Sequence, residues 1–283
     1  MNGRIVLSIP IDLDSRQDIA TALASKYGTD YVFIGRVFRS TIADESCEID
    51  ICPLEKEIKE LPPEASDRNY KQTLRNKFEF AGHLDEITLQ QLDRSRQLIY
   101  LTSAEVGYQA CLQIARLTQV LLQIGGIAVK LESADVAHSR DRWLSNYNSD
   151  DVFDIYSLYV ALVEGEEYYY SCGMHHFGKA DVAIATGTPY EVQALKDLLR
   201  GTRSVIALTE DIGLAIYVMN VFNYYRLTES PILQDGHTFR PDIECPQYVL
   251  KWITDYEHTA DSDCYNPHGR WLLTLNIARQ LRP

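Results

Sequence analysis

The sequence lacks the linear patterns that assign many proteins to a functional class. No segment reaches the about 18 uninterrupted apolar residues that cross a bilayer, and Asp12 soon interrupts the apolar run of the N-terminus. The six cysteines form no C-x-x-C pair, the histidines show no H-E-x-x-H or H-x-H spacing, and no glycine-rich phosphate loop follows a predicted strand. We therefore expect a cytoplasmic protein with reduced thiols and no built-in cofactor or metal.

Positive charge is also scarce. The chain has 27 Lys and Arg against 40 Asp and Glu, which gives a formal net charge of -13. Proteins that bind nucleic acid or anionic membranes need clustered basic residues. The charge argues against both partners and leaves an unknown small molecule or a protein partner, with a basic protein as one alternative.

The chain has the size and composition of a globular protein. Its 283 residues are 46% hydrophobic, which is enough for a core without disulfides or metal. Apolar periodicity over the first 101 residues predicts the order β-α-β-β-α-β, the split arrangement of ferredoxin-like folds. The predicted strands are Ile5–Ile9, Tyr31–Phe38, Glu48–Cys52 and Gln97–Leu101, and the helices are Ser15–Tyr27 and Asp67–Phe80.

A helix over Ser103–Ile124 is the clearest element of the second half, and Thr102 and Glu105 form a T-x-x-E capping box at its start. Strand-like residues precede and follow it, which predicts a β-α-β unit with parallel strands and a right-handed crossover. These strands are Leu98–Leu101 and Ile127–Leu131.

A tyrosine-rich hairpin is predicted further along the chain, from Ile155–Val163 and Glu167–Cys172 joined at the sequence EGE. The other predicted elements are helices over Asp135–Tyr147, Thr188–Gly201 and Ala207–Leu227, and strands in DGHTF, PQYVLKWI and GRWLLTL.

Together these patterns predict an α+β protein whose mixed sheets carry helices on one face. The polar segment Asp85–Arg96 is either a short helix or the linker between two halves. We therefore expect a ferredoxin-like half over residues 1–95 and a larger half over residues 96–283, either as two domains or as one continuous domain.

The stretch Tyr168–Asp181 gathers the most reactive side chains of the chain. Cys172 is a candidate nucleophile because His175 and His176 follow it closely. If the two histidines are extended, they point to opposite faces of a strand. The hypothesis is a hydrolase-like site, metal-assisted or cysteine-based, in which distant residues converge. Its candidates are His138, Cys172, His175, His176, Asp181 and His237, with His138, His176 and His237 as the alternative metal ligands.

Each of these residues also has a structural interpretation. Histidines near turns commonly hydrogen-bond locally and position loops, and a cysteine at the end of a strand is commonly a small core residue. Whether the chain is an enzyme stays open on these patterns alone.

Aromatic residues and turns supply candidate ligand contacts. Three consecutive tyrosines and two on the predicted partner strand form either an aromatic wall for a planar ligand or a cross-strand packing cluster. They are Tyr168, Tyr169 and Tyr170, with Tyr156 and Tyr159 on the partner strand. The turns DGHT and NPHGR aim a histidine from a sharp bend. The candidate ligand-binding residues are Tyr168, Tyr170, His138 and His268.

Four segments resemble an uncharacterised, mainly bacterial family known only as a domain of unknown function, number four-two-six-one. They are GGIAVKLESADVAHS, YYYSCGMHHFGKAD, LQDGHTF and YNPHGRWLL, and the resemblance covers about residues 100 to 273. It implies an intracellular α+β protein without an assigned activity. The leading interpretation is a binding or protein-interaction module without a built-in cofactor, and the alternative is the hydrolase-like enzyme.

Overall fold

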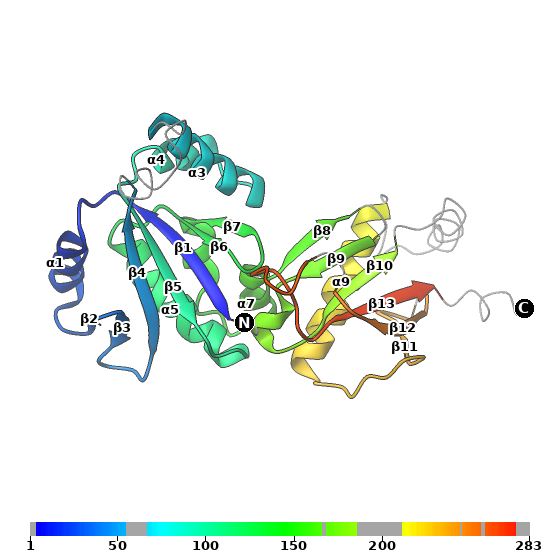
Figure 1. Ribbon diagram of the computed structural model, residues 1–283. Coiled ribbons are helices and arrows are strands. Elements are labelled where there is room, and N and C mark those ends of the chain that lie inside the picture. Colours follow the sequence, from blue (N-terminus) through cyan, green and yellow to red (C-terminus); the bar gives the residue numbers. More distant parts are fainter. Residues whose placement is uncertain are drawn as a thin grey trace, which may run out of the picture. The chain divides into compact units, whose positions relative to one another are not determined.

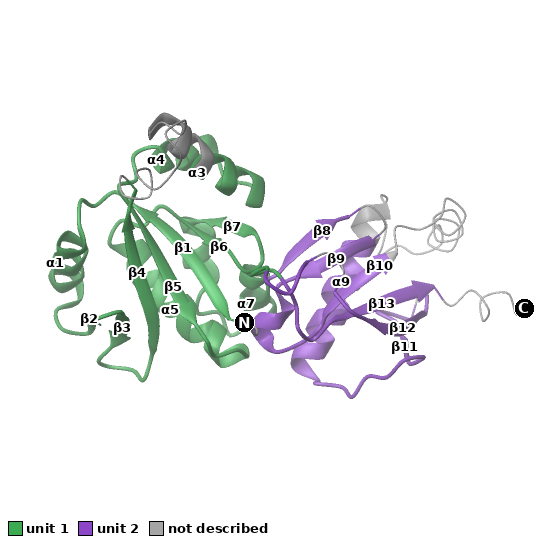
Figure 2. Ribbon diagram, viewed as in Figure 1, with its two compact units in different colours: residues 1–159, 262–264 green, residues 160–261, 265–283 purple. Residues whose placement is uncertain are grey.

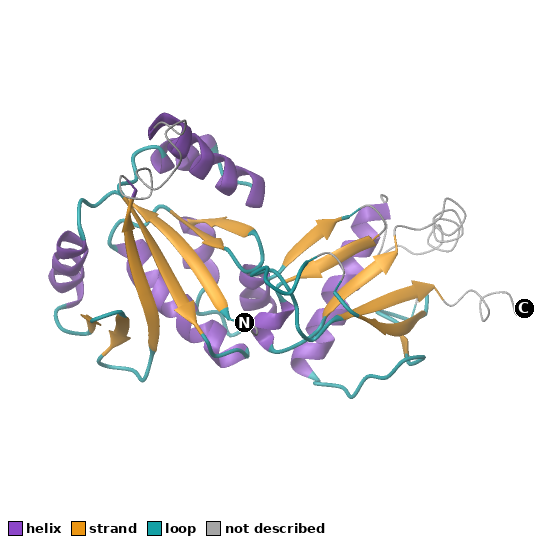
Figure 3. Cartoon of the chain, in the orientation of Figure 1, coloured by secondary structure: helices purple, strands orange, loops and turns teal. Residues whose placement is uncertain are grey.

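The computed structural model describes residues 4–54, 67–165, 168–185, 211–243, 245–255 and 258–275, without the side chains of residues 67–73, 185 and 211–214. The chain forms two compact units, shown in different colours in Figure 2. Unit 1 comprises Met1–Tyr159 and Ser262–Cys264, and unit 2 comprises Val160–Asp261 and Tyr265–Pro283. The predicted boundary at residues 95 and 96 falls within unit 1. Helices and strands are mixed in both units, which confirms the α+β class (Figure 3).

Unit 1 is built on a seven-stranded sheet with the order β2-β3-β4-β5-β1-β6-β7 (Figure 1). Every pair of neighbouring strands in this sheet is antiparallel. The strands are β1 (Ile5–Ile11), β2 (Tyr31–Ile34), β3 (Val37–Ser40), β4 (Ser46–Pro53), β5 (Gln97–Ser103), β6 (Ala128–Leu131) and β7 (Val136–Ser139). The helices are α1 (Arg16–Tyr27), α3 (Asp67–Ala81), α4 (Glu86–Leu92), α5 (Tyr108–Gln123), α6 (Arg140–Asn146) and α7 (Val152–Tyr159).

The predicted β-α-β unit is present as β5, α5 and β6. Strands β5 and β6 each pair antiparallel with β1, so they run parallel to one another with β1 between them. The helix begins at Tyr108, later than predicted, and its N-cap is Gly107 with φ 118. The predicted capping box at Thr102 and Glu105 is wrong because β5 continues through Ser103, whose hydroxyl bonds with the backbone of Glu105.

The ferredoxin-like detail is not confirmed. The split arrangement would set β1 beside the strand at residues 48–52, whereas β5 lies between β1 and β4 and pairs antiparallel with both. The predicted strand Tyr31–Phe38 is two short strands, because the chain reverses at Gly35 with φ 60.

Two predicted elements between residues 135 and 163 are wrong. The predicted helix Asp135–Tyr147 starts instead as strand β7, and the predicted strand Ile155–Val163 is mainly helix α7. Four buried residues of α7, namely Ile155, Tyr156, Leu158 and Tyr159, recur at helical spacing, and a short apolar run does not distinguish helix from strand. Tyr156 and Tyr159 therefore belong to α7 rather than to the predicted partner strand of the tyrosine hairpin.

Unit 2 is built on a six-stranded sheet with the order β11-β12-β13-β10-β9-β8. The pair of β10 and β13 is parallel and the other pairs are antiparallel. Its strands are β8 (Ala161–Glu164), β9 (Tyr168–Cys172), β10 (Asp181–Ala185), β11 (Thr238–Phe239), β12 (Tyr248–Ile253) and β13 (Arg270–Leu275), with the short 3-10 helix η1 (Met174–Phe177) and helix α9 (Asp211–Thr228). A hairpin is present as predicted, but its first strand is β8 (Ala161–Glu164) rather than Ile155–Val163. The three C-terminal strands confirm the prediction, and the predicted helix Thr188–Gly201 lies outside the described residues.

Helix α9 packs on one face of this sheet. Its Val218, Met219 and Phe222 are buried against Val182 of β10 and Leu273 of β13 in one apolar cluster. Successive strand residues point to opposite faces, so the neighbours of these core residues face away from the helix. That second face carries polar residues at the start of β10 and β13.

Within the described residues, no helix combines the length and the apolar character needed to cross a bilayer.

Candidate functional site

Five buried polar residues of unit 2 meet where β10 and β13 begin. We call them the polar cluster: Ser171, Asp181, Asp255, Asn266 and Arg270, each at most 5% exposed. The parallel register sets Asp181 directly beside Arg270. The loop between β12 and β13 contributes Asp255 and Asn266, which precede Arg270 in the sequence. Buried polar groups at this density require partners, and the structure supplies them.

Asp181 accepts hydrogen bonds on both carboxylate oxygens. The Ser171 hydroxyl and the Met174 backbone N–H donate to Oδ1 at 3.0 and 3.2 Å, and the Asn266 side-chain amide donates to Oδ2 at 2.6 Å. Gly173 precedes Met174 with φ 121, a conformation that glycine adopts without strain. Burial raises the pKa of Asp181 to about 6, although these bonds and the charge of Arg270 act in the opposite direction.

Asp255 forms a buried ion pair with Arg270. Arg270 Nη2 lies 2.8 Å from Asp255 Oδ1, and the two side chains are 3% and 1% exposed. The guanidinium carbon lies 4.3 Å from the ring centroid of Tyr170, within cation–π range. Burial opposes ionisation of Asp255, but hydrogen bonding to His258 and the charge of Arg270 outweigh it and lower its pKa. Asp255 is therefore held as a carboxylate.

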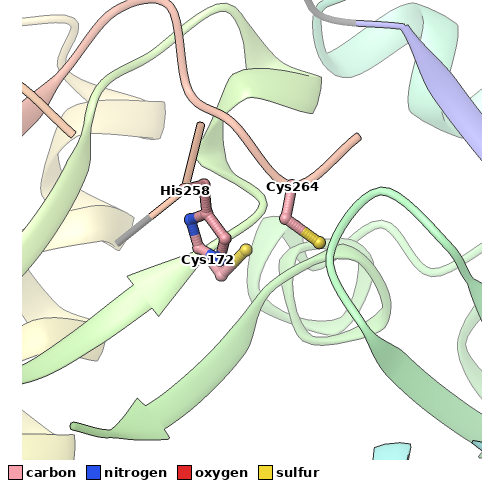
Figure 4. A group of neighbouring side chains, drawn as sticks. All are labelled: Cys172, His258 and Cys264. Carbon is pink, nitrogen blue, oxygen red and sulfur yellow. The ribbon is translucent and has the colours of Figure 1, made fainter. Parts of the chain in front are cut away.

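His258 connects this carboxylate to Cys172. Its Nδ1 lies 3.2 Å from Asp255 Oδ2, and its ring meets Tyr170 edge to face with the centroids 6.3 Å apart. A ring nitrogen of His258 lies within 4.8 Å of Cys172 Sγ (Figure 4). Figure 4 also labels Cys264, which belongs to the segment 262–264 of unit 1. Unit 2 thus supplies a thiol, an imidazole and a carboxylate in which the imidazole lies between the other two groups.

The donor set of this chain is one that metals accept, because thiolate and imidazole are ligands of zinc. Structural zinc sites have four ligands and catalytic ones have three. Cys172 and His258 are the two such side chains that unit 2 brings together at this point, among the residues that the structure describes.

The predicted histidines lie at several places. His138 is in β7 of unit 1, and its Nε2 lies 2.9 Å from the Leu158 carbonyl oxygen. Burial lowers the pKa of His138 to about 4, so its imidazole is neutral at pH 7. His175 and His176 are fully buried in η1 with ring centroids 4.1 Å apart, so they are not extended residues of a strand. A metal site formed by His138, His176 and His237 stays a prediction.

His237 and His268 lie in turns of unit 2, as the sequence indicates. His237 is exposed just before β11, and His268 is also exposed, with its backbone N–H bonded to Asn266 Oδ1 at 2.9 Å. Burial, followed by the charge of Arg226, lowers the pKa of His268.

Sequence reasoning missed Asp255 and His258 as neighbours of Cys172. Asn266 and Arg270 stood in a quoted motif, YNPHGRWLL, but appeared only as turn residues. The available signal was the pair of polar residues in NPHGR next to a predicted strand. No nearby sequence pattern indicated that the loop before Asn266 returns to Cys172, because the position of this loop depends on how β12 and β13 pair.

A second feature of unit 2 is the exposed indole of Trp252 near the end of β12. The Trp252 backbone N–H donates to Asp235 Oδ1 at 2.6 Å, and its indole N–H donates to the His268 carbonyl oxygen at 3.0 Å. Gly269 lies so close that a Cβ there would sit 2.6 Å from the indole ring. The turn DGHT therefore holds the backbone of Trp252 and the turn NPHGR holds its indole, and the residue is nevertheless 46% exposed.

No family model matches the chain, and no match is found among curated proteins or solved structures. The resemblance to the domain-of-unknown-function family over residues 100 to 273 stays a prediction.

Proposed function

We propose that this protein is a binding module that recognises a protein partner through a surface centred on Trp252. The observation that carries the proposal is the fixed yet exposed indole. Trp252 is held at its backbone, at its indole N–H and across its ring by Asp235, His268 and Gly269, and 46% of it remains exposed.

An aromatic side chain of this kind suits recognition for two reasons. Its rotamer is already fixed, so binding costs little additional conformational entropy. Tryptophan also offers a large apolar area with a polar edge, and it is enriched among residues that dominate binding energies. The two turns that hold Trp252 act here as the rigid support for a contact residue.

The surroundings favour a protein over a small planar ligand. The segment that reaches Trp252 through Asp235 also exposes Ile232, which is 87% exposed, and His237 lies exposed two residues after Asp235. Exposed aromatic and aliphatic side chains on two tethered segments are the kind of apolar surface that a protein partner covers.

The net charge of -13 supports a partner that carries basic residues around its apolar contact. A cytoplasmic location, and a partner that is neither nucleic acid nor membrane, are parts of this proposal.

Affinity capture with the wild type and two matched variants tests it. Trp252→Ala removes the contact residue, and Phe80→Ala removes an aromatic side chain of unit 1 that is 88% exposed. We expect one or more proteins from the native lysate to bind the wild type and Phe80→Ala, to elute at high salt, and to be depleted about tenfold or more with Trp252→Ala. Equal capture by Trp252→Ala and the wild type would contradict the proposal.

A further inference from the structure

Three side chains of unit 2 lie outside the Trp252 surface and form a connected series. His258 Nδ1 lies 3.2 Å from Asp255 Oδ2, and a ring nitrogen of His258 lies within 4.8 Å of Cys172 Sγ. A thiol, an imidazole and a carboxylate in this order form the nucleophilic site of many unrelated cysteine enzymes. We propose that Cys172, His258 and Asp255 form a nucleophilic site that hydrolyses small esters or thioesters.

Asp255 is fixed more firmly than a loop residue usually is. Besides His258, it binds Arg270 at 2.8 Å and accepts the Asn266 backbone N–H at 3.2 Å. Arg270 is itself placed over Tyr170. A carboxylate held in this way accepts a hydrogen bond from Nδ1–H and leaves Nε2 as the nitrogen that can take the proton of a thiol.

Access to the thiol limits the substrate. Cys172 is 3% exposed, whereas the side chain of His258 is 20% exposed, so the imidazole forms the solvent-facing side of the site. Because the sulfur is buried, we expect the site to take a small acyl group rather than a polymeric substrate. The separation of up to 4.8 Å between sulfur and nitrogen is longer than a hydrogen bond, and such contacts commonly shorten when substrate binds.

The reaction balances without an oxidant or a reductant. Cys172 Sγ transfers its proton to His258 and forms a bond to the carbonyl carbon, and the bond from that carbon to the leaving oxygen or sulfur breaks. His258 gives the proton to the departing alcohol or thiol. Water then attacks the acyl-enzyme while His258 accepts its proton, the carboxylic acid leaves, and the thiol recovers its proton.

The alternative is that the same contacts only hold the loop against the sheet. The two interpretations differ in the reactivity of the sulfur, because a thiolate paired with an imidazolium reacts at neutral pH and a purely structural buried thiol does not.

Cys245 provides an internal control for that difference. It lies in the same unit and is 4% exposed, against 3% for Cys172. Alkylation with iodoacetamide between about pH 6 and pH 10 is quantified for each cysteine by mass spectrometry. One sample then yields the dependence of the alkylation rate on pH for both Cys172 and Cys245.

We expect Cys172 to react at least about tenfold faster than Cys245 near pH 7, with a profile that is already flat where that of Cys245 still rises. His258→Asn should remove the advantage of Cys172 and leave the Cys245 rate unchanged. Coinciding profiles for the two cysteines in the wild type would overturn the proposal, and this result does not depend on any variant.

A second measurement tests the acyl chemistry itself. With p-nitrophenyl acetate, the wild type should release a burst of p-nitrophenol and carry an acetyl group on Cys172. Cys172→Ser should lose the burst, and Cys245→Ala should keep it. A reactive Cys172 that never becomes acetylated would refute the hydrolytic activity.

Discussion

Asp181→Asn tests the electrostatics of the polar cluster most directly. The carboxylate is fully buried, and burial raises its pKa from 3.8 to about 6. The folded state therefore holds the proton more tightly than the unfolded state does. The group contributes no penalty below about pH 4, and it increasingly destabilises the fold as the pH rises toward 6. Above that pH the cost is constant at about 3 kcal/mol.

An asparagine at this position cannot ionise, so it removes the pH-dependent part of the destabilisation. It also introduces a constant cost of about 1–3 kcal/mol, because one oxygen becomes an NH₂ group and faces donors such as the Asn266 amide. We therefore expect the free energy of unfolding of Asp181→Asn to gain up to about 3 kcal/mol relative to the wild type between about pH 4 and pH 7.

Urea unfolding of both proteins at several pH values, followed by circular dichroism and tryptophan fluorescence, measures this change. Asp44→Asn, which removes an exposed carboxylate of unit 1, is the matched control for the loss of one acidic side chain. If the difference between Asp181→Asn and the wild type is constant from pH 4 to pH 7, the buried carboxylate does not carry the assigned pKa.

Two further substitutions examine the contacts around this cluster. Arg270→Met should destabilise the protein by about 3–5 kcal/mol in urea unfolding, because it leaves the charged Asp255 buried without the guanidinium. Adding Asp255→Asn to the same chain should restore part of the lost stability. No recovery in the double variant would argue against charge as the cause. Gly269→Ala should cost about 2–4 kcal/mol, because its Cβ would lie 2.6 Å from both the Ile253 carbonyl oxygen and the Trp252 ring. Gly236→Ala, at a similar φ of 82 with nothing within 4 Å, should cost only about 1 kcal/mol, and equal losses would exclude the steric explanation.

Local patterns were sufficient wherever one segment determined its own structure. The apolar stripe of α5 and the strand-like residues on both sides of it predict β5, α5 and β6, and the alternation in PQYVLKWI and GRWLLTL predicts β12 and β13. Helix α7 escaped the same reasoning. Its run of buried Ile155, Tyr156, Leu158 and Tyr159 satisfies either period, and the decision comes from contacts such as the hydrogen bond from the Tyr159 hydroxyl to the Cys111 carbonyl oxygen.

The order of strands is a tertiary property for the same reason. The sequence contains the elements of a ferredoxin-like half in the expected succession, yet β5 pairs with β1 along seven residues and with β4 along six. Which edge of β1 takes which strand depends on the helices and strands that follow residue 101, so the first half of the chain could not indicate it alone.

The candidate site, like the fold, could be predicted only in part from the sequence. Cys172 and Asp181 could be predicted as candidates because Cys172 ends one strand and Asp181 begins the next, within one polar stretch. Asp255 and His258 lie more than seventy residues later, and their proximity to Cys172 follows from the antiparallel pairing of Ile253 with Arg270, which holds both ends of the connection between β12 and β13 at one edge of the sheet. The parallel pairing of β10 with β13 brings that same edge next to Asp181.

Asn266 connects the two carboxylates that this topology brings together. Its backbone N–H donates to Asp255, its side-chain amide donates to Asp181 and to the Lys179 carbonyl oxygen, and its Oδ1 accepts the backbone N–H of His268. Because one residue bonds both carboxylates, a change in the charge of Asp181 alters the bond that helps to place Asp255, and through Asp255 the ring of His258. Protonation of Asp181 below about pH 6 should therefore loosen the imidazole that faces Cys172, and the alkylation rate of Cys172 should fall more steeply there in the wild type than in Asp181→Asn.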